Sequence, residues 1–301
     1  MRTAAIGIGS NSLRMLVADV EAGLLHRIQR YRAGLRVFAA LDEQGNIKPE
    51  MLADACRSVR EFQLEAEQAG AERIHLFATS AVRDASNQDA FSRALFEATG
   101  LELDICSGDT EASLSFWGAA EEHPCGLIDI GGGSTEIAIG YQQRIDCAFS
   151  LQMGAVRLYR MKPIFSLDQA REVEKIASDI LSEHLHTLAV HKPNEWIGVG
   201  GTFTTCASLI QQTPWENRTH IHGYRITLEA LENAIAFLAP MPMEERLKLP
   251  CLQPQRADIV VHGMTILSAC MKRMNIPSIV VSECGNLEGY LKAKYIFNAK
   301  I

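Results

Sequence analysis

Apolar and polar residues along this chain follow two different periods, and the changes between them predict strands alternating with helices. Short apolar or alternating runs predict strands at 3–8, 13–20, 24–31, 74–78, 101–106, 127–130, 136–140, 144–150, 196–199 and 279–281. Helical spacing of apolar residues predicts helices at 49–69, 88–99, 111–120, 167–190, 203–211, 228–238, 256–274 and 286–295. Pro49 suits the start of the first helix, and Asn87 is expected to cap the second. This order of elements is typical of an α/β protein.

The stretch 127–136 reads Leu-Ile-Asp-Ile-Gly-Gly-Gly-Ser-Thr-Glu, so an apolar strand runs directly into a polar turn. Three consecutive glycines pack no side chains, but they let backbone N–H groups approach a ligand closely. Such N–H groups form an anion-binding concavity, to which Ser134 and Thr135 add hydroxyl donors. Asp129 and Glu136 add carboxylate oxygens, which suit a divalent metal. The stretch indicates phosphate bridged by a metal ion, and a glycine-rich hairpin without a ligand is the alternative.

The same pattern of strand, glycine–serine turn and strand occurs at 4–12, which reads Ala-Ala-Ile-Gly-Ile-Gly-Ser-Asn-Ser. The two copies lie near the starts of two halves of the chain. Two such hairpins facing each other would hold a polyphosphate from both sides. A dinucleotide-binding G-x-G-x-x-G loop should instead open a helix, whereas residues 136–140 alternate like a strand. We therefore predict an α/β protein with the actin-like ATPase fold, in which two ribonuclease H-like domains enclose a phosphate-binding cleft.

Length and composition fit a two-domain globular protein. The 301 residues suit domains at 1–123 and 124–301, joined near 121–124, with the last helix free to pack back on the first domain. The net charge of −7 provides no overall field that would attract nucleic acid. No apolar run reaches the ~18 residues of a membrane span, and no signal-peptide pattern is present. The eight cysteines form no C-x-x-C pair, which is typical of buried thiols in a reducing cytoplasm.

Other candidate residues each have a purely structural alternative. Glu111 lies in the first turn of a predicted helix, where the helix dipole alone favours a carboxylate. Residues 200–202 read Gly-Gly-Thr between a strand and a helix, which makes either an anion site or a tight turn. His222 is either a catalytic group or, more commonly for a single histidine, a structural hydrogen-bonding residue. Arg36 lies in an irregular segment and would face a ligand there.

Taken together, these residues resemble the Ppx/GppA family, the exopolyphosphatase and guanosine pentaphosphate phosphohydrolase enzymes. The matching segments follow the family's order from end to end, at 9–12, 78–84, 108–112, 129–136, 150–158, 200–202, 222–223 and 282–291. The length is similar to the short form of the family, which has two actin-like domains and lacks a C-terminal helical extension. The resemblance implies that a cytoplasmic enzyme removes the terminal phosphate of inorganic polyphosphate, or acts on guanosine pentaphosphate in the stringent response.

The resemblance also implies a role for each matching residue. Glu111 matches the catalytic glutamate that orients and deprotonates the attacking water. Asp129 and Glu136 match the carboxylates that hold Mg²⁺, with Mn²⁺ as the alternative. Phosphate-binding donors are expected from Ser10, Asn11, Ser12, Arg83, Gly131, Gly132, Gly133, Ser134 and Thr135. Further substrate contacts are expected from Arg36, Arg157, Gly201, Thr202 and His222. No nucleic acid or membrane partner is expected, and a homodimer is open because the family commonly dimerises.

The chain departs from the family pattern at two places. The first family hairpin reads Ile-Asp-x-Gly-Ser-Asn-Ser, and here Gly7 replaces the aspartate, so we expect open space there with a water filling the gap. The last family motif reads Ser-Asp-x-Gly-Leu-Arg-Glu-Gly, and residues 282–289 lack its arginine. These departures favour a second hypothesis, a phosphate-chain or nucleotide sensor that has lost turnover. A sugar or acetate kinase shares the broad fold but not the order of these motifs.

Overall fold

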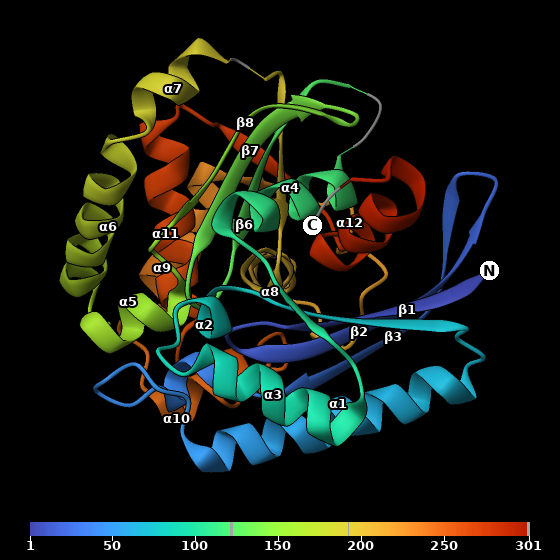
Figure 1. Cartoon of the computed structure of the whole chain (residues 1–301). Coiled ribbons are helices and arrows are strands. Elements are labelled where there is room, and N and C mark those ends of the chain that lie inside the picture. The colour runs from blue at the N-terminus through green and yellow to red at the C-terminus, as the bar shows by residue number, and fades with distance from the viewer. Residues whose placement is uncertain (121–122, 192, 300–301) are drawn as a thin grey trace. The chain divides into compact units, whose positions relative to one another are not determined.

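A computed structural model of the protein describes residues 1–120, 123–191 and 193–299, and these form two compact α/β units (Figure 1). Unit 1 comprises Met1–Gly118 together with the C-terminal segment that begins at Asn286, and unit 2 is the intervening Ala119–Gly285. The connection predicted at 121–124 includes residues 121 and 122, which lie outside the described residues. The first and last parts of the chain therefore share one unit.

Unit 1 is built on a five-stranded mixed sheet with the strand order β3-β2-β1-β4-β5. Strands β1 to β3 are antiparallel, and β4 and β5 run parallel to β1. The strands are β1 (Arg2–Ile8), β2 (Ser12–Glu21), β3 (Leu24–Gly34), β4 (Arg73–Ala78) and β5 (Leu103–Ile105). The helices are η1 (Val37–Ala40), α1 (Pro49–Gln68), α2 (Ser80–Arg83), α3 (Gln88–Thr99), α4 (Gly108–Ala119), α12 (Asn286–Lys292) and its π-helical continuation η3 (Ala293–Phe297).

Unit 2 is built on a six-stranded mixed sheet with the strand order β10-β11-β9-β6-β7-β8. The strands are β6 (Cys125–Ile130), β7 (Thr135–Tyr141), β8 (Arg144–Leu151), β9 (Glu195–Val199), β10 (Arg225–Thr227) and β11 (Ser278–Val281). The helices are α5 (Ala155–Met161), α6 (Leu167–Ser182), α7 (Leu185–Val190), α8 (Gly201–Ile210), α9 (Leu228–Leu238), α10 (Met243–Arg246), η2 (Pro254–Arg256) and α11 (Val260–Arg273).

The two sheets share one topology. In unit 2, the order β8-β7-β6-β9-β11 repeats the order β3-β2-β1-β4-β5 of unit 1. The directions also match, because the first three strands of each series are antiparallel and the last two run parallel to the third. A ribonuclease H-like sheet that occurs twice in one chain is the duplicated, actin-like arrangement, so the predicted fold class is confirmed.

Both faces of the unit 1 sheet are covered by helices (Figure 1). Helix α1 lies on one face, where Phe62 meets Tyr31 of β3 with ring centroids 6.1 Å apart. Helix α12 lies on the other face, where the Tyr290 ring stacks on Phe77 of β4 at a centroid distance of 4.6 Å. Leu287 packs into the same apolar cluster. Helix α12 therefore completes the core of unit 1, although it comes last in the chain.

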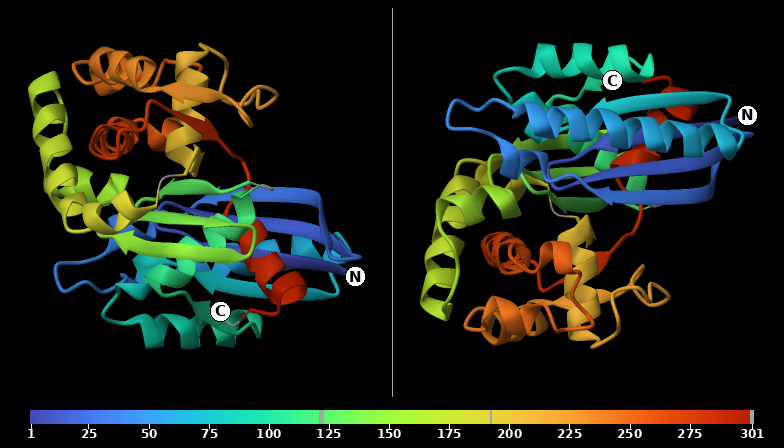
Figure 2. Two further views of the ribbon diagram at one scale, coloured as in Figure 1. Left: turned by 90° about the horizontal axis from the view of Figure 1, so that it is seen from above. Right: turned by 90° about the horizontal axis from the view of Figure 1, so that it is seen from below.

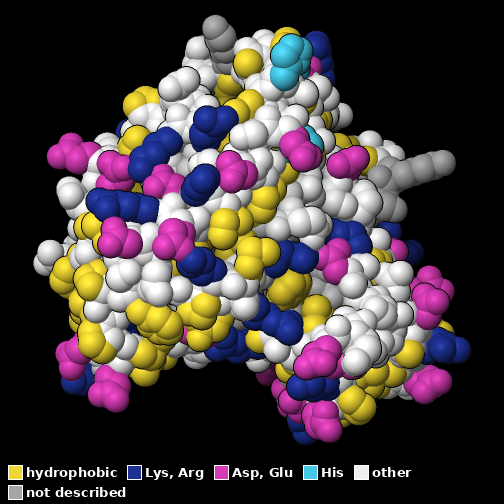
Figure 3. Space-filling model, turned by 90° about the vertical axis from the view of Figure 1, so that its left-hand side faces the viewer, with side chains coloured by type: hydrophobic (Ala, Val, Ile, Leu, Met, Phe, Trp, Pro, Cys, Tyr) yellow, Lys and Arg dark blue, Asp and Glu magenta, His cyan; other side chains and the backbone are white. Residues whose placement is uncertain are grey.

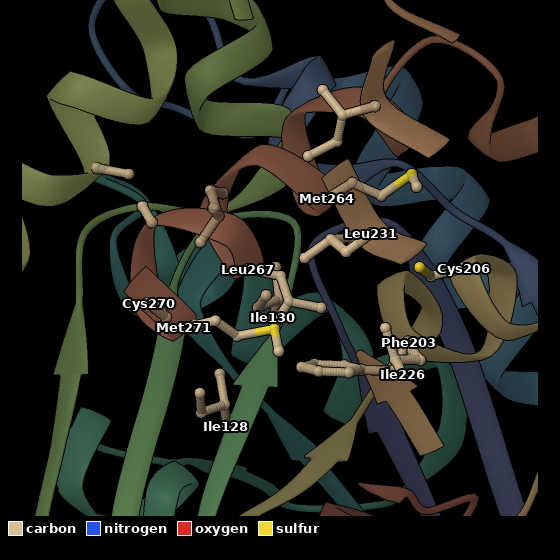
Figure 4. Close-up of a cluster of buried hydrophobic side chains, with 14 of the residues drawn as sticks. Ile128, Ile130, Phe203, Cys206, Ile226, Leu231, Met264, Leu267, Cys270 and Met271 are labelled. Atoms are coloured by element: carbon tan, nitrogen blue, oxygen red, sulfur yellow. The ribbon is translucent and has the colours of Figure 1, made fainter. Parts of the chain in front are cut away.

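The core of unit 2 lies between its sheet and a layer of helices. Ile128 and Ile130 of β6 belong to the same buried cluster as Phe203 of α8 and Leu267 and Met271 of α11 (Figure 4). Helices α6 and α11 pack side by side in this layer (Figure 2). In α11, burial all round the helix fits its mostly apolar sequence, because a helix that is hydrophobic on every side needs to be covered.

Two local predictions were wrong for the same reason. Asn87 does not cap α3; its side chain instead bonds the backbone of Ile47, with the Ile47 N–H 2.9 Å from Oδ1. The helix predicted at 167–190 is two helices, α6 and α7, with a break at Glu183 and His184. At that break the His184 ring stacks on Phe149 of β8, with centroids 4.4 Å apart. In both cases a contact distant in sequence accompanies the departure from the local pattern.

Charges are mixed rather than gathered by sign on the face of the molecule that Figure 3 shows. Lysine and arginine alternate with aspartate and glutamate on the face shown in Figure 3. A phosphate ligand must therefore be bound by local groups, as the net charge of −7 also requires. Among the described residues, no helix is both long enough and apolar enough to cross a bilayer. The eight cysteines are thiols, buried or partly buried.

Candidate active site

The first glycine hairpin joins β1 to β2 in a tight four-residue turn. The Gly9 N–H donates to the Ser12 carbonyl at 3.0 Å, which closes the turn. Ser10, Asn11 and Ser12 are all buried in it. The Ser10 hydroxyl also lies 3.2 Å from the hydroxyl of Ser80, at the start of α2. The structure thus gathers three of the four predicted phosphate-binding residues of unit 1 in one turn, and Arg83 is the fourth.

Residues at the start of η1 donate backbone hydrogen bonds to this hairpin. The Arg36 N–H donates to the Asn11 carbonyl at 3.3 Å, and the Phe38 N–H donates to the Ser10 carbonyl at 3.0 Å. Arg36 has a left-handed backbone with φ of 42°. A non-glycine residue in this conformation costs energy and is common at functional sites. The backbone of Arg36 therefore lies at the hairpin, and contact of its side chain with a ligand stays a prediction.

The side chain of Asn11 indicates that the hairpin has a ligand. Asn11 is 7% exposed, and neither its Oδ1 nor its Nδ2 has a hydrogen-bond partner among the described residues. Burying an amide without partners is costly, and native proteins rarely leave such groups unsatisfied. Phosphate oxygens would accept from Nδ2, as the resemblance implies. This orphaned amide is the strongest sign of a polar ligand in unit 1.

Arg83 and Glu111 form an ion pair that the sequence analysis missed. Arg83 Nη1 lies 2.8 Å from Glu111 Oε2, and the same nitrogen donates to the Cys106 carbonyl at 3.0 Å. Glu111 is 6% exposed at the start of α4, and Asp84 lies 3.6 Å from Arg83. The parallel pairing of β4 and β5 carried the missing signal, because the segments that follow adjacent parallel strands meet at one edge of a sheet.

Cys106 beside this pair remains a neutral thiol. Burial, and next the charges of Glu111 and Asp104, raise the pKa of its thiol to about 12. A thiol with that pKa carries almost no thiolate near pH 7, and the thiolate is the nucleophile. The ionisable group suited to chemistry here is therefore Glu111.

The space beside Gly7 is filled, which contradicts the expectation of an open gap that holds a water. A Cβ on Gly7 would lie 2.8 Å from Cζ of Phe77, the residue opposite it on β4. Phe77 in turn stacks on Tyr290 and shares a cluster with Leu287. Leu287 occupies the position of the family arginine in the last motif. Both departures from the family pattern therefore meet in one apolar cluster of unit 1.

The second glycine hairpin joins β6 to β7 and closes in the same way as the first. The Gly131 N–H donates to the Ser134 carbonyl at 3.0 Å. Its support differs, because Ala155, Val156 and Arg157 at the start of α5 donate N–H bonds of 2.8–3.0 Å to the carbonyls of Gly131 and Gly132. A Cβ on Gly154 would lie 2.3 Å from the Gly132 backbone, so only glycine fits there. These bonds use the carbonyl oxygens of Gly131 and Gly132 and fix the turn against α5.

Arg157 and Thr135 both make bonds within the fold of unit 2. Arg157 Nε donates to the Gly133 carbonyl at 2.6 Å, so this side chain holds the turn. The Thr135 hydroxyl donates to the Met153 carbonyl at 2.5 Å, which uses its one proton. Ser134 is buried as well. A phosphate contact from the hydroxyl proton of Thr135 would require that bond to break.

Asp129 and Glu136 lie directly opposite each other on β6 and β7. Asp129 is 9% exposed and Glu136 is 1% exposed, and the Ser150 hydroxyl donates to Glu136 Oε1 at 2.7 Å. Like charges directly opposite each other destabilise a sheet. A divalent cation between the two carboxylates would reverse that repulsion. The donor set fits Mg²⁺, which is commonly held by one or two carboxylates completed by phosphate and water.

The strand-to-helix turn at Gly200 and Gly201 lies against Asp129. A Cβ on Gly200 would lie 2.8 Å from Asp129 Oδ1, and Gly200 has φ of 96°. A Cβ on Gly201 would lie 1.8 Å from Cζ of Arg256, so this guanidinium lies directly over the start of α8. The sequence analysis did not single out Arg256, which no local pattern connects to residue 201. The structure thus places Arg256 and Asp129 at neighbouring positions of one strand-to-helix turn.

Thr202 and His222, which are both expected to contact substrate, make contacts within unit 2. Thr202 is buried against α11, where a Cβ on Gly263 would lie 2.5 Å from its Oγ1. His222 is exposed, and its Nδ1 accepts from the Glu283 N–H at 3.3 Å. Within the described residues, no group of three or more His, Cys, Asp or Glu side chains forms a metal cluster. The paired carboxylates thus remain the candidate metal ligands.

The chain is similar to proteins of one family over nearly its whole length. The sequence model of the Ppx/GppA phosphatase family matches residues 16–295. Exopolyphosphatase 2 of Mycobacterium tuberculosis is 30% identical over 311 residues, which cover 96% of this chain and 97% of that protein. The crystal structure of an exopolyphosphatase-like protein is 27% identical, with a TM-score of 0.91 over 97% of both chains.

A second solved structure shares the fold. The crystal structure of an exopolyphosphatase from Cytophaga hutchinsonii has a TM-score of 0.90 and 23% identity, covering 100% of this chain and 99% of that one. These similarities agree with the order of motifs along the sequence and with the duplicated sheet. The chain belongs to the Ppx/GppA phosphatase family.

Proposed function

We propose that this protein is an exopolyphosphatase, which releases the terminal phosphate of inorganic polyphosphate by attack of water. The observation that carries the proposal is the buried, opposed pair Asp129 and Glu136 directly behind a glycine turn. Carboxylates that bind a metal and backbone donors that bind phosphate are the two requirements of phosphoryl transfer. The names of relatives at 30% and 27% identity support polyphosphate as the substrate.

In this proposal Glu111 is the general base. Its carboxylate accepts a proton from water while the water oxygen bonds to the terminal phosphorus. The bond from that phosphorus to the bridging oxygen breaks, and the shortened chain leaves with the electron pair. Arg83 holds the Glu111 carboxylate in one orientation through the 2.8 Å contact. Asn11 and the turn donors of both hairpins position the phosphates.

Asp129 and Glu136 would hold Mg²⁺, with Mn²⁺ as the alternative. The metal supplies charge neutralisation on phosphate oxygens when it is bound. Ser150 orients the Glu136 carboxylate through its 2.7 Å bond. Eight thiols without disulfides support a reducing compartment, and we propose the cytoplasm.

A second candidate function is a sensor that binds phosphate chains or guanosine pentaphosphate without turnover. Phe77 favours it, because its ring fills the place where the family aspartate would stand. The enzyme is nevertheless the better proposal, since Glu111, Arg83, Asp129 and Glu136 are all present and buried or half-buried.

The test measures phosphate release from polyphosphate and from guanosine pentaphosphate, with and without Mg²⁺ or Mn²⁺. A parallel assay supplies ATP with a sugar and follows phosphoryl transfer. We expect metal-dependent release from polyphosphate. Release from guanosine pentaphosphate alone would change the substrate, and binding of either ligand without release would make the protein a sensor. Phosphoryl transfer to the sugar would identify a kinase instead.

A further inference from the structure

Arginines gather on one face of the edge strand β3. Arg30 and Arg32 are two residues apart, so their side chains lie on the same face of the strand. Arg27 is three residues from Arg30, so regular alternation would place it on the opposite face. A β-bulge intervenes, because Val17 pairs with Gln29 but Ala18 pairs with Arg27, which skips Ile28. The bulge returns Arg27 to the face of Arg30 and Arg32. Both Arg27 and Arg32 are exposed.

Helix α12 covers this same face of the sheet at strands β1, β2 and β4. Arg30 makes an ion pair with Glu288 of α12, and Leu16, which pairs with Arg30, packs in the α12 cluster. A buried carboxylate thus balances the middle arginine. The two outer arginines, Arg27 and Arg32, lie on the same face, one on each side of Arg30 along the strand.

A fourth arginine stands directly opposite Arg32. Arg14 of β2 pairs with Arg32 in the strand register, so two cations face each other across the ladder. Like charges directly opposite each other destabilise a sheet, and an anion bound near both guanidinium groups would reduce that repulsion. Arg14 Nη2 donates to Asn286 Oδ1 at 3.1 Å, while its buried Nε has no hydrogen-bond partner among the residues described. The orphaned Nε points to an anionic ligand at this position.

The arginine row begins at the phosphate hairpin. Gly34, at the end of β3, pairs with Ser12 of the first hairpin, and Arg32 lies two residues before it. From there the row leads away along the strand to Arg27, about 20 Å distant at ~3.3 Å per residue. One end of the row therefore meets the turn that would bind the terminal phosphates.

We propose that Arg14, Arg32, Arg30 and Arg27 form a track that binds the distal phosphates of a long polyphosphate chain. The inference rests on the proposed function, and it names long linear polyphosphate as the preferred substrate. Guanidinium groups suit it, because their planar fork of donors binds phosphate oxygens in pairs. A short chain ends before it reaches Arg27, so the track selects by length.

The experiment measures KM against polyphosphates of increasing length for Arg27→Gln and Arg32→Gln. We expect Arg27→Gln to raise KM only for long chains, by about three- to tenfold, with kcat unchanged. Arg32→Gln should begin to raise KM at a shorter chain length than Arg27→Gln, because Arg32 lies nearer the hairpin. Arg57→Gln, at an exposed position of α1, is the matched control and should leave KM unchanged at every length.

Arg27→Lys separates charge from folding, since it keeps the cation and should retain most of the affinity for long chains. Titration calorimetry with long polyphosphate and with tripolyphosphate, without metal, measures binding apart from turnover. If the parent binds long chains through Arg27 but releases no phosphate, the track stands and the proposed hydrolysis fails. If Arg27→Gln and Arg57→Gln have the same affinity at every length, the track is overturned whether or not the protein hydrolyses polyphosphate.

Discussion

The two glycine hairpins close with the same backbone bond but carry opposite charges at the second pair of strand residues from the turn. Each closes with a glycine N–H bonded to a serine carbonyl at 3.0 Å. Across the sheet behind the second turn, the row reads Val199, Asp129, Glu136, Ser150. The equivalent row behind the first turn reads Phe77, Gly7, Arg14, Arg32. The same frame therefore presents carboxylates for a cation in unit 2 and guanidinium groups for an anion in unit 1.

The neighbouring parallel strand explains why the rows diverged. In unit 2, Gly200 follows Val199 and leaves Asp129 just enough room, since a Cβ there would lie 2.8 Å from Oδ1. In unit 1, Phe77 fills the equivalent space beside Gly7. In this chain the two turns are alike, and the residue on the neighbouring parallel strand differs between the two rows. The following predictions test that division between the units.

The largest expected effect comes from Glu111→Gln, which removes the proposed base from unit 1. We expect kcat to fall by about 10²- to 10⁴-fold, because an amide orients water but takes no proton from it. The Mg²⁺ concentration at half-maximal rate should not change if the metal belongs to unit 2. Asp84→Asn, which alters the other carboxylate near Arg83, is the matched control. A kcat within twofold of the parent would remove Glu111 from the mechanism.

Asp129→Asn and Glu136→Gln test the cation side of the comparison. Each removes an anionic oxygen, and we expect the Mg²⁺ requirement to rise by about 10- to 100-fold. Ser150→Ala should move it in the same direction by less, because it only frees the Glu136 carboxylate. Asp146→Asn, on the same strand as Ser150, serves as the control. Saturation curves that overlay the parent's would show that neither carboxylate serves the metal.

Gly7→Asp places an aspartate in unit 1 at the position equivalent to Asp129 of unit 2. The Cβ would collide with Phe77, so we expect a loss of about 1–3 kcal/mol in the free energy of unfolding, measured by denaturant titration. Adding Phe77→Val copies Val199 and removes the collision. The double variant should lose less free energy of unfolding than the two single variants lose when their losses are added. Gly34→Asp, where no atom lies within 4 Å of a Cβ, should cost far less. Equal losses at positions 7 and 34 would refute the collision with Phe77.

Asn11→Ala should have the smallest effect, and its sign is unusual. Removing a buried amide without partners is expected to raise the stability of the protein without phosphate by about 1 kcal/mol. The same change should reduce the stabilisation that added polyphosphate gives in thermal melts. Asn46→Ala is the contrast, because Asn46 bonds Asp42 and its loss should lower stability. A lower melting temperature for Asn11→Ala without ligand would mean that its amide is satisfied.

Local patterns along the sequence were sufficient for most of the fold. Apolar runs that flank glycine turns predicted both hairpins, and their strands agree with β1, β2, β6 and β7 within about two residues. The break between α6 and α7 escaped prediction, because residues 167–190 keep a helical pattern while His184 stacks on Phe149, 35 residues away. Asn87 likewise bonds Ile47 rather than its own helix.

The candidate site divides along the same line. Residues inside motifs, such as Glu111, Asp129 and Asn11, could be named because these motifs match those of the family in order, and their roles stay predictions. Their partners could not, because Arg256 reaches Gly201 and Phe77 reaches Gly7 only through the folded sheet. The filled space at Gly7 is the clearest case. The sequence shows that Gly7 has no side chain, but only the structure shows that Phe77 on the neighbouring strand occupies the space beside it.

The position of α12 in unit 1 has a consequence for synthesis of the chain. Phe77 and Leu16 are covered by residues that leave the ribosome only after all of Ala119–Gly285 has been made. At roughly 5–20 residues per second, that delay lasts about 10–30 s. During this interval the newly made N-terminal sheet exposes an apolar face to solvent and to chaperones. The unit whose synthesis starts first is thus the last to have all of its residues.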